Sequence, residues 1–336
     1  MAVNLNKLAS VQKTHRENVR RLFAGEPVAS VVSIDMLPQE SNCEWDAGEF
    51  PAWLRKSLDF LDRGLPEAFD ETTYRPLVME FWPLGVHFVD ALFGAQVFQR
   101  DGNFWNDPLQ GDLGDLRPID VENAPLARWM FACLGQMVAA MPSGVISAAP
   151  VFASPLNIAL NLFNERALIG LHRAEPSALR GMRIIADAIR SLHALVRKEF
   201  REDQVRFYAS SFRWAPDGFG HICGCSTHLI GPELYARHVA ALDEMVLGVF
   251  PCGGTIHLCG RHTQHIPVWR AMKVVRGVQL NDAATEDFET YFRGLREDQI
   301  IYVTPNERMP VEKIVKISGG RRIILQTRLG EPISLT

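Results

Sequence analysis

The sequence predicts an α/β protein, a single (β/α)8 TIM barrel with an N-terminal extension. The length of 336 residues is compatible with one such barrel, which typically takes roughly 250 residues or more. Short apolar runs alternate with longer helical patterns, as expected of parallel strands joined by crossover helices. A doubly wound sheet would show the same alternation, but neither GxGxxG nor GxxxxGK[ST] occurs in the chain.

Eight apolar runs of strand length support the barrel. In chain order they are residues 77–81, 145–150, 205–210, 227–230, 255–259, 278–281, 300–304 and 323–327. Helical patterns separate them at 155–163, 176–197 and 232–250, and each of these begins with a proline. Proline suits the first turn of a helix, where its missing N–H is not needed. The alternation therefore predicts eight strands and the helices between them.

Residues 1–70 do not follow this alternation. They contain a short basic helix around 16–23, a possible strand at 28–34 and a helix at 51–63 that ends at Gly64. We expect them to pack over one end of a barrel formed by residues 71–336. Residues 98–123 show neither helical nor strand periodicity, so they are interpreted as a surface loop or as a lid over the barrel mouth.

Composition limits the partners and the location. The chain has 35 Lys and Arg against 39 Asp and Glu, a formal net charge of −4, which disfavours nucleic acid and anionic membranes as partners. The most apolar segment, 137–153, is too short for a membrane span and contains two prolines. The N-terminus has no apolar signal segment, so we expect a cytoplasmic protein with six cysteines as thiols. A small-molecule substrate is expected.

Histidine and cysteine are concentrated in one part of the chain. Six of ten histidines and four of six cysteines fall between His221 and His265. His257 and Cys259 lie at a predicted strand end, so both side chains share the face that points into the barrel, about 6.6 Å apart along the backbone. Imidazole and thiolate are zinc ligands. Cys225 is the favoured third ligand and Cys223 the alternative, although buried cysteines are often simply small apolar residues.

Three segments resemble the uroporphyrinogen decarboxylase superfamily. They are 229–235 (LIGPELY), 256–260 (IHLCG) and 278–281 (VQLN); in that superfamily an "iSPe.y.ef" helix start precedes an "iHiCGn" strand end. The resemblance extends through 150–197 and 16–25, and so covers nearly the whole chain. It implies a single (β/α)8 barrel with its site at the C-terminal mouth.

Two branches of the superfamily differ in chemistry. True decarboxylases carry an "RPxWxMRQAGR" motif and an "FsDIL" aspartate; neither occurs here, and the corresponding region 35–38 lacks the arginines. The other branch consists of zinc-dependent methyltransferases, which pass methyl groups between a small substrate or coenzyme thiol and a corrinoid. The chain resembles this branch, because His257 and Cys259 match two of its zinc-ligand positions. Its usual later cysteine is missing, because no cysteine follows Cys259. Cys225, Cys223 or a carboxylate would replace it.

Further candidates lie at the ends of the predicted strands. Glu80 and His257 are the catalytic candidates. Glu80 would be an acid or base, or a metal ligand, although a surface salt bridge would explain it equally well. The substrate-binding candidates are Trp82, Tyr208, Arg261, Asn281 and Asp282. Among these, Asn281 would serve as a hydrogen-bonding anchor, and Arg261, together with His262 next to it, would bind a carboxylate or phosphate.

Three functions follow from these patterns. The first is a zinc-dependent methyltransferase that acts with a corrinoid, or a corrinoid protein, and a small thiol. The second is a metal-free decarboxylase or lyase of a tetrapyrrole or another polycarboxylate, which the missing arginine motif disfavours. The third is a non-catalytic binding protein that retains the barrel. A serine triad is not supported, because the chain has no GxSxG motif.

Overall fold

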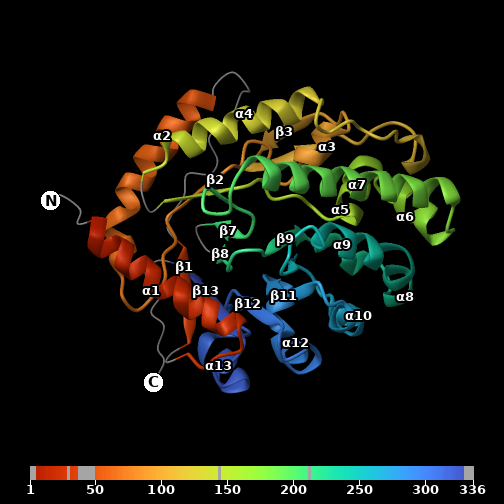
Figure 1. The fold of residues 1–336 in the computed structure, drawn as a ribbon. Helices are drawn as coiled ribbons and strands as arrows, with labels where there is room; N and C mark the ends of the chain where they lie inside the picture. Colours follow the sequence, from red (N-terminus) through yellow and green to blue (C-terminus); the bar gives the residue numbers. More distant parts are fainter. Residues whose placement is uncertain (1–4, 29–30, 37–49, 143–144, 211–212, 329–336) are drawn as a thin grey trace.

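Parallel strands ringed by helices make up the protein (Figure 1). The structure is a computed structural model and describes residues 5–28, 31–36, 50–142, 145–210 and 213–328. The helices are α1 (Leu5–Phe23), α2 (Phe50–Gly64), α3 (Phe88–Leu92), α4 (Pro125–Ala140), α5 (Pro155–Phe163), α6 (Glu165–His172), α7 (Pro176–Glu199), α8 (Pro232–Leu234), α9 (Ala240–Leu247), α10 (Ile266–Ala271), α11 (Ala283–Glu286), α12 (Phe288–Gly294) and α13 (Val311–Ser318).

Most of the strands belong to two parallel sheets. One has the order β1-β13-β12-β11-β10-β9, and the other has the order β2-β5-β6. Their bounds are β1 (Val32–Met36), β2 (Val78–Glu80), β5 (Ile146–Ala148), β6 (Val205–Arg206), β9 (Gly220–Cys223), β10 (Gly254–Leu258), β11 (Val275–Leu280), β12 (Ile300–Val303) and β13 (Ile323–Arg328). Two antiparallel hairpins complete the set, β3 (Val97–Arg100) with β4 (Asn103–Asn106) and β7 (Ala209–Ser210) with β8 (Arg213–Trp214).

Single parallel bridges connect the two sheets on both sides. Ile34 of β1 pairs with Tyr74, which precedes β2, and Ala153, which follows β5, pairs with Cys223 of β9. This arrangement is consistent with a TIM-barrel-like fold. In the described part of the chain, however, the ladders form separate sheets and not one uninterrupted barrel ladder.

The two faces of the sheet have different environments. Ile301 and Val303 of β12 join the large core shared with the surrounding helices, whereas Ile300 and Tyr302 join a second core. This is the period of two expected of a strand. The second core also contains Val19 and Phe23 of α1, so the N-terminal helix packs against the inner face of the sheet.

The structure corrects one predicted strand. Residues 227–230 are not a strand but lie mostly in a 3₁₀ helix, η4 (Cys225–Leu229), and the strand is β9 just before it. The Thr227 hydroxyl donates to the carbonyl of Gly224 at 2.9 Å, which closes a tight turn where the apolar, β-branched sequence had favoured a strand. The other seven predicted runs overlap β2, β5, β6 with β7, and β10 to β13.

The other differences between the predicted and the observed elements concern a loop and a helix. Residues 98–123, expected to be irregular, contain the β3–β4 hairpin and a 3₁₀ turn, η3 (Leu113–Asp115). The helix predicted at 232–250 is interrupted by a π-helical segment, η5 (Tyr235–Val239). Short 3₁₀ helices also occur at η2 (Leu65–Phe69) and η6 (Thr263–His265).

The N-terminal segment contributes to the main sheet. Its strand β1 is the edge strand next to β13, so residues 1–70 are not only a cover. Residues 1–4, 29–30 and 37–49, and with them part of region 35–38, lie outside the described residues.

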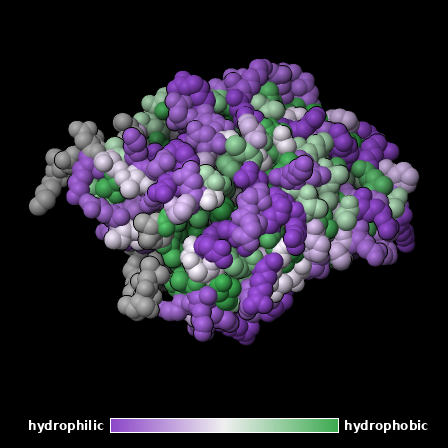
Figure 2. All heavy atoms as spheres, turned by 60° about the horizontal axis from the view of Figure 1, so that its bottom comes forward, coloured by the Kyte–Doolittle hydropathy of each residue, from purple (hydrophilic) through white to green (hydrophobic). Residues whose placement is uncertain are grey.

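Figure 2 shows one face of the molecule, on which hydrophilic residues predominate. Among the described residues, none of the helices combines the length and the apolar character that crossing a membrane requires.

Candidate metal centre

Four sulfur and nitrogen ligand atoms meet at the carboxyl ends of β9 and β10. The Sγ atoms of Cys223 and Cys225 are 3.4 Å apart, and Cys225 Sγ lies 3.3 Å from Cys259 Sγ. His257 Nε2 lies 3.0 Å from Cys259 Sγ. The ligand atoms of Cys223, Cys225 and His257 all lie within 4.8 Å of one another. All four residues predicted as metal ligands are thus brought together.

This set of donor atoms fits zinc. Zinc binds sulfur at about 2.3 Å and nitrogen at about 2.0–2.1 Å in a tetrahedron, which separates neighbouring donors by about 3.5–3.8 Å. The contacts observed, from 3.0 to 3.4 Å, are shorter by a few tenths of an ångström. A small outward movement at each of these three contacts would therefore give the spacing that donors around zinc have.

The sheet register brings the strand residues together. His257 pairs with Cys223 on one side and with Gln279 on the other. Leu258, the next residue along β10, is fully buried in the core shared with the helices. His257 consequently faces the opposite side, where its ring centroid is 6.3 Å from that of His221.

Gln279 orients the His257 ring. The side-chain oxygen of Gln279 lies 3.1 Å from His257 Nδ1, and an amide oxygen only accepts, so Nδ1 carries the proton and Nε2 faces the cysteines. Gln279 is fully buried, and it also donates to Gln326 at 3.1 Å and accepts from Arg213 at 3.3 Å. Such an outer partner fixes the tautomer of a metal-binding histidine.

Asn157, in the first turn of α5, contacts the most buried of these sulfurs. Its oxygen accepts hydrogen bonds from the backbone N–H of Ser226 and from the hydroxyl of Ser154. Its Nδ2 therefore points at Cys223 Sγ, 3.7 Å away. An N–H donor in this position stabilises a thiolate on Cys223.

The electrostatics of the cluster favour two thiolates. The hydrogen bond from Cys225 and the nearby His257 lower the pKa of Cys259 to about 5, and the same two neighbours lower that of Cys223 to about 6. The contacts of Cys225 with the sulfurs of Cys223 and Cys259 raise its own pKa, so Cys225 keeps its one proton, which it donates to Cys259. Burial acts to lower the pKa of His257, but the contact with Cys259 and the charge of Cys223 outweigh it and raise the pKa. The centre thus holds negative charge suited to a cation.

The other predicted site residues lie around this cluster. Arg261 is held by Glu286 at 2.6 Å and by Asp287 at 2.8 Å, so its charge is already balanced by two carboxylates. Asn281 accepts a hydrogen bond from Thr304 at 3.2 Å. Asp282 follows β11 with a backbone φ of +49°, and its charge acts on Cys259.

The remaining three predicted site residues are Tyr208, Glu80 and Trp82. Tyr208 is buried in the inner core, where its ring stacks on His221 at 5.0 Å. Glu80 ends β2 and pairs with Ala148 of β5, and both Glu80 and Trp82 are half-buried. The catalytic role of Glu80 and the substrate-binding roles of Tyr208 and Trp82 stay predictions.

Several residues around the cluster were not predicted. Gln279 could have been found, because it lies two residues before Asn281 and so shares its face of the strand. Asn157 and Thr227 carry no comparable signal, since their contacts with the centre depend on how α5, η4 and the loop after β10 meet in space. His262 was expected with Arg261 to bind a carboxylate or phosphate, but its two ring nitrogens contact Thr227 and Gly260.

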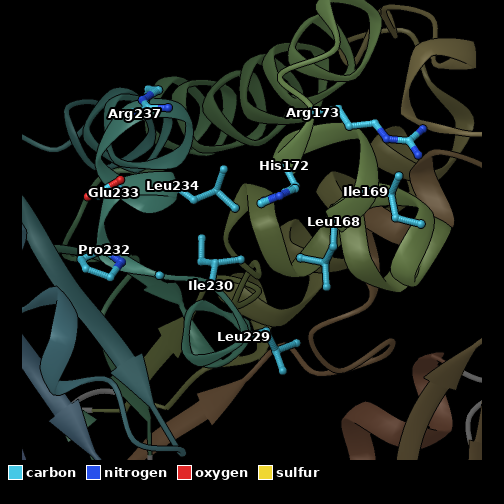
Figure 3. Close-up of a pocket in the computed structure, with 11 residues that line it drawn as sticks. Leu168, Ile169, His172, Arg173, Leu229, Ile230, Pro232, Glu233, Leu234 and Arg237 are labelled. Carbon is cyan, nitrogen blue, oxygen red and sulfur yellow. The ribbon is translucent and has the colours of Figure 1, made fainter.

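A hydrophobic groove begins where η4 ends. It has a volume of about 770 Å³ and is formed by α6, the end of η4, α8 and η5. In Figure 3 the side chains of Leu168, Ile230 and Leu234 point toward one another across it. Leu229, 54% exposed, and Ile169, 46% exposed, also line it. The groove is separate from the inner face that carries His257.

Comparison with known proteins supports the fold. No protein-family model matches the chain, and no curated protein matches it either. Among solved structures, the chain is similar to a methyltransferase from Methanosarcina mazei, with a TM-score of 0.65, 11% sequence identity, and coverage of 96% of this chain and 95% of the other. The two proteins thus share a related fold over nearly their full lengths.

Proposed function

We propose that this chain is a zinc-dependent methyltransferase that acts on a small thiol with a corrinoid as the second substrate. The observation that carries the proposal is the convergence of Cys223, Cys225, His257 and Cys259 at the strand ends. The related fold of a methyltransferase supports it at the level of architecture. We also propose that the nine parallel strands form one barrel around this site, with eight strands from residues 71–336 and β1 from the N-terminal extension, residues 1–70.

Three of the four ligands would hold the metal during catalysis. A catalytic zinc takes three protein ligands and keeps one position for substrate. We assign His257, Cys259 and Cys225, because the Cys225 sulfur contacts that of Cys259 directly at 3.3 Å. Cys223, which is buried and contacted by Asn157, is the alternative third ligand.

Zinc, when bound, would act as a Lewis acid that lowers the pKa of a substrate thiol and so supplies a thiolate at neutral pH. The protein residues prepare this chemistry. Gln279 holds the His257 ring with Nε2 toward the sulfurs. The low pKa of Cys259 provides one ligand without a proton, whereas Cys225 would release its proton when it binds the metal. The polar face of β10 and β11 would contact the substrate, and a corrinoid protein is the proposed macromolecular partner.

The proposal is tested by methyl transfer from methylcobalamin to small thiols, followed by absorbance and by detection of the thioether. The wild-type protein loaded with zinc should catalyse transfer, and Cys259→Ser should not. Carbon dioxide release from polycarboxylates without metal would favour a decarboxylase instead. If the protein catalyses neither reaction but binds one of these substrates tightly, the result would favour a binding protein.

A further inference from the structure

We infer that His262 is a positioning residue that holds the Cys225 segment and the Cys259 segment at the separation a shared metal requires. This inference rests on the proposed metal site and adds a residue outside its ligand set. Thr227, in η4, and His262, after β10, are 1% and 0% exposed, so their hydrogen bond is shielded from water.

The direction of each hydrogen bond follows from the contacts. The Thr227 hydroxyl donates to the carbonyl of Gly224 at 2.9 Å, so its oxygen is left to accept from His262 Nδ1 at 2.8 Å. His262 Nε2 then carries no proton and accepts the backbone N–H of Gly260 at 3.2 Å. One ring thus connects Thr227, two residues after Cys225, to Gly260, the residue after Cys259.

A second imidazole fills the space between the same segments. His228 Nδ1 donates to the carbonyl of Cys225 at 2.6 Å, and a Cβ on Gly260 would lie only 3.2 Å from the His228 ring. The rings of His228 and His262 meet edge to face, with centroids 5.5 Å apart. The absence of a side chain at position 260 therefore allows the two segments to approach closely.

His262 acts through this connection and not as a ligand. Both of its ring nitrogens are engaged by Thr227 and Gly260, so neither is free to bind an ion. Removing an outer partner of a metal site typically weakens metal binding 10–100-fold. Here the weakening would come from the loss of fixed spacing between Cys225 and Cys259.

The experiment measures cobalt(II) affinity by competition with a chromophoric chelator, together with the thiolate-to-cobalt absorption at saturation. Thr227→Val, which replaces the hydroxyl with a methyl group of similar size, should weaken binding 10–100-fold and change the absorption band. His262→Asn, which keeps a donor toward Thr227, should bind more tightly than His262→Leu. Thr227→Ser should behave as the wild type.

Ser318→Ala is the matched control. Ser318 is also buried, donates to Ile314 and accepts from Gly320, but it lies at the end of α13. It should lose a similar amount of stability and keep its cobalt affinity and spectrum. If Thr227→Val and His262→Leu fold and bind cobalt like Ser318→Ala, the inference is wrong. If the wild type binds no cobalt, the proposed metal function fails first.

Discussion

The sulfur of Cys225 lies 3.3 Å from that of Cys259, although 34 positions separate the two residues in the chain. Neighbouring parallel strands, β9 and β10, end side by side and bring the two thiols together. Together with His257, these sulfurs could hold a metal ion, and they lie at the C-terminal edge of the parallel strands, where TIM barrels carry their active sites.

Replacing Cys225 tests the third ligand. Cys225→Ser should weaken zinc binding more than 100-fold, because loss of a direct ligand exceeds the 10–100-fold typical of outer partners. Cys223→Ser should cost less. The affinities are measured by competition with a zinc chelator, and Cys133→Ser, in α4, is the control that should bind as the wild type. Equal losses in Cys223→Ser and Cys225→Ser would contradict the assignment of Cys225.

Gln279 offers a test of the His257 orientation. Gln279→Leu should weaken zinc binding 10–100-fold and lower the free energy of unfolding by about 1–3 kcal/mol, because Gln326 and Arg213 each lose a buried partner. Gln279→Glu keeps an acceptor for His257 Nδ1 and should recover most of the zinc affinity. Denaturant titration of the metal-free protein separates the two effects. An affinity of Gln279→Leu equal to that of the wild type would rule out the positioning.

The burial of His193 is expected to make the stability of the folded protein decrease in acid. Its ring lies among Phe152, Phe207 and Phe250, with centroids 4.9–5.6 Å away, and neither ring nitrogen has a hydrogen-bond partner. Burial, followed by the charge of Arg197, lowers its pKa to about 3. The unfolded chain, with a pKa near 6.5, binds the proton first, so stability is full above pH 6.5 and falls as the pH drops toward 3.

The expected loss from His193 is about 2 kcal/mol between pH 7 and pH 5. His193→Phe removes this proton uptake and should lose about 2 kcal/mol less over the same range in urea titrations. His221 and His262 also have lowered pKa values and remain in both proteins, so the comparison isolates His193. Identical pH dependence of the two proteins would show that His193 does not carry the effect.

Replacing Tyr235 tests two buried hydrogen bonds that connect η5 to α9 and α10. Its hydroxyl donates to Asp243 at 2.7 Å and accepts from Trp269 at 2.9 Å. Tyr235→Phe should lower the free energy of unfolding by about 1–3 kcal/mol, since both partners lose a buried bond. Burial already raises the pKa of Asp243 to about 7, so the loss should be larger at pH 8 than at pH 5. A loss that does not depend on pH would contradict the protonation of Asp243.

The sequence predicts the site where local rules decide it. The one-residue spacing of His257 and Cys259 on a strand fixes their common face, and the order of the strands brings Cys225 near them. By contrast, β9 was not predicted, because residues 227–230 have the more strand-like composition while the Thr227 hydroxyl closes a local turn. The contacts of Asn157 with Cys223, and of Thr227 with His262, join segments far apart in the chain, and a pattern within one segment does not indicate them.

Zinc content is the most direct test of the central claim. Protein purified without chelators from zinc-supplemented medium, and analysed by inductively coupled plasma mass spectrometry, should contain about one zinc per chain, while Cys259→Ser prepared in parallel should contain almost none. Equal zinc in the two proteins, or no zinc in the folded wild type, would contradict the account.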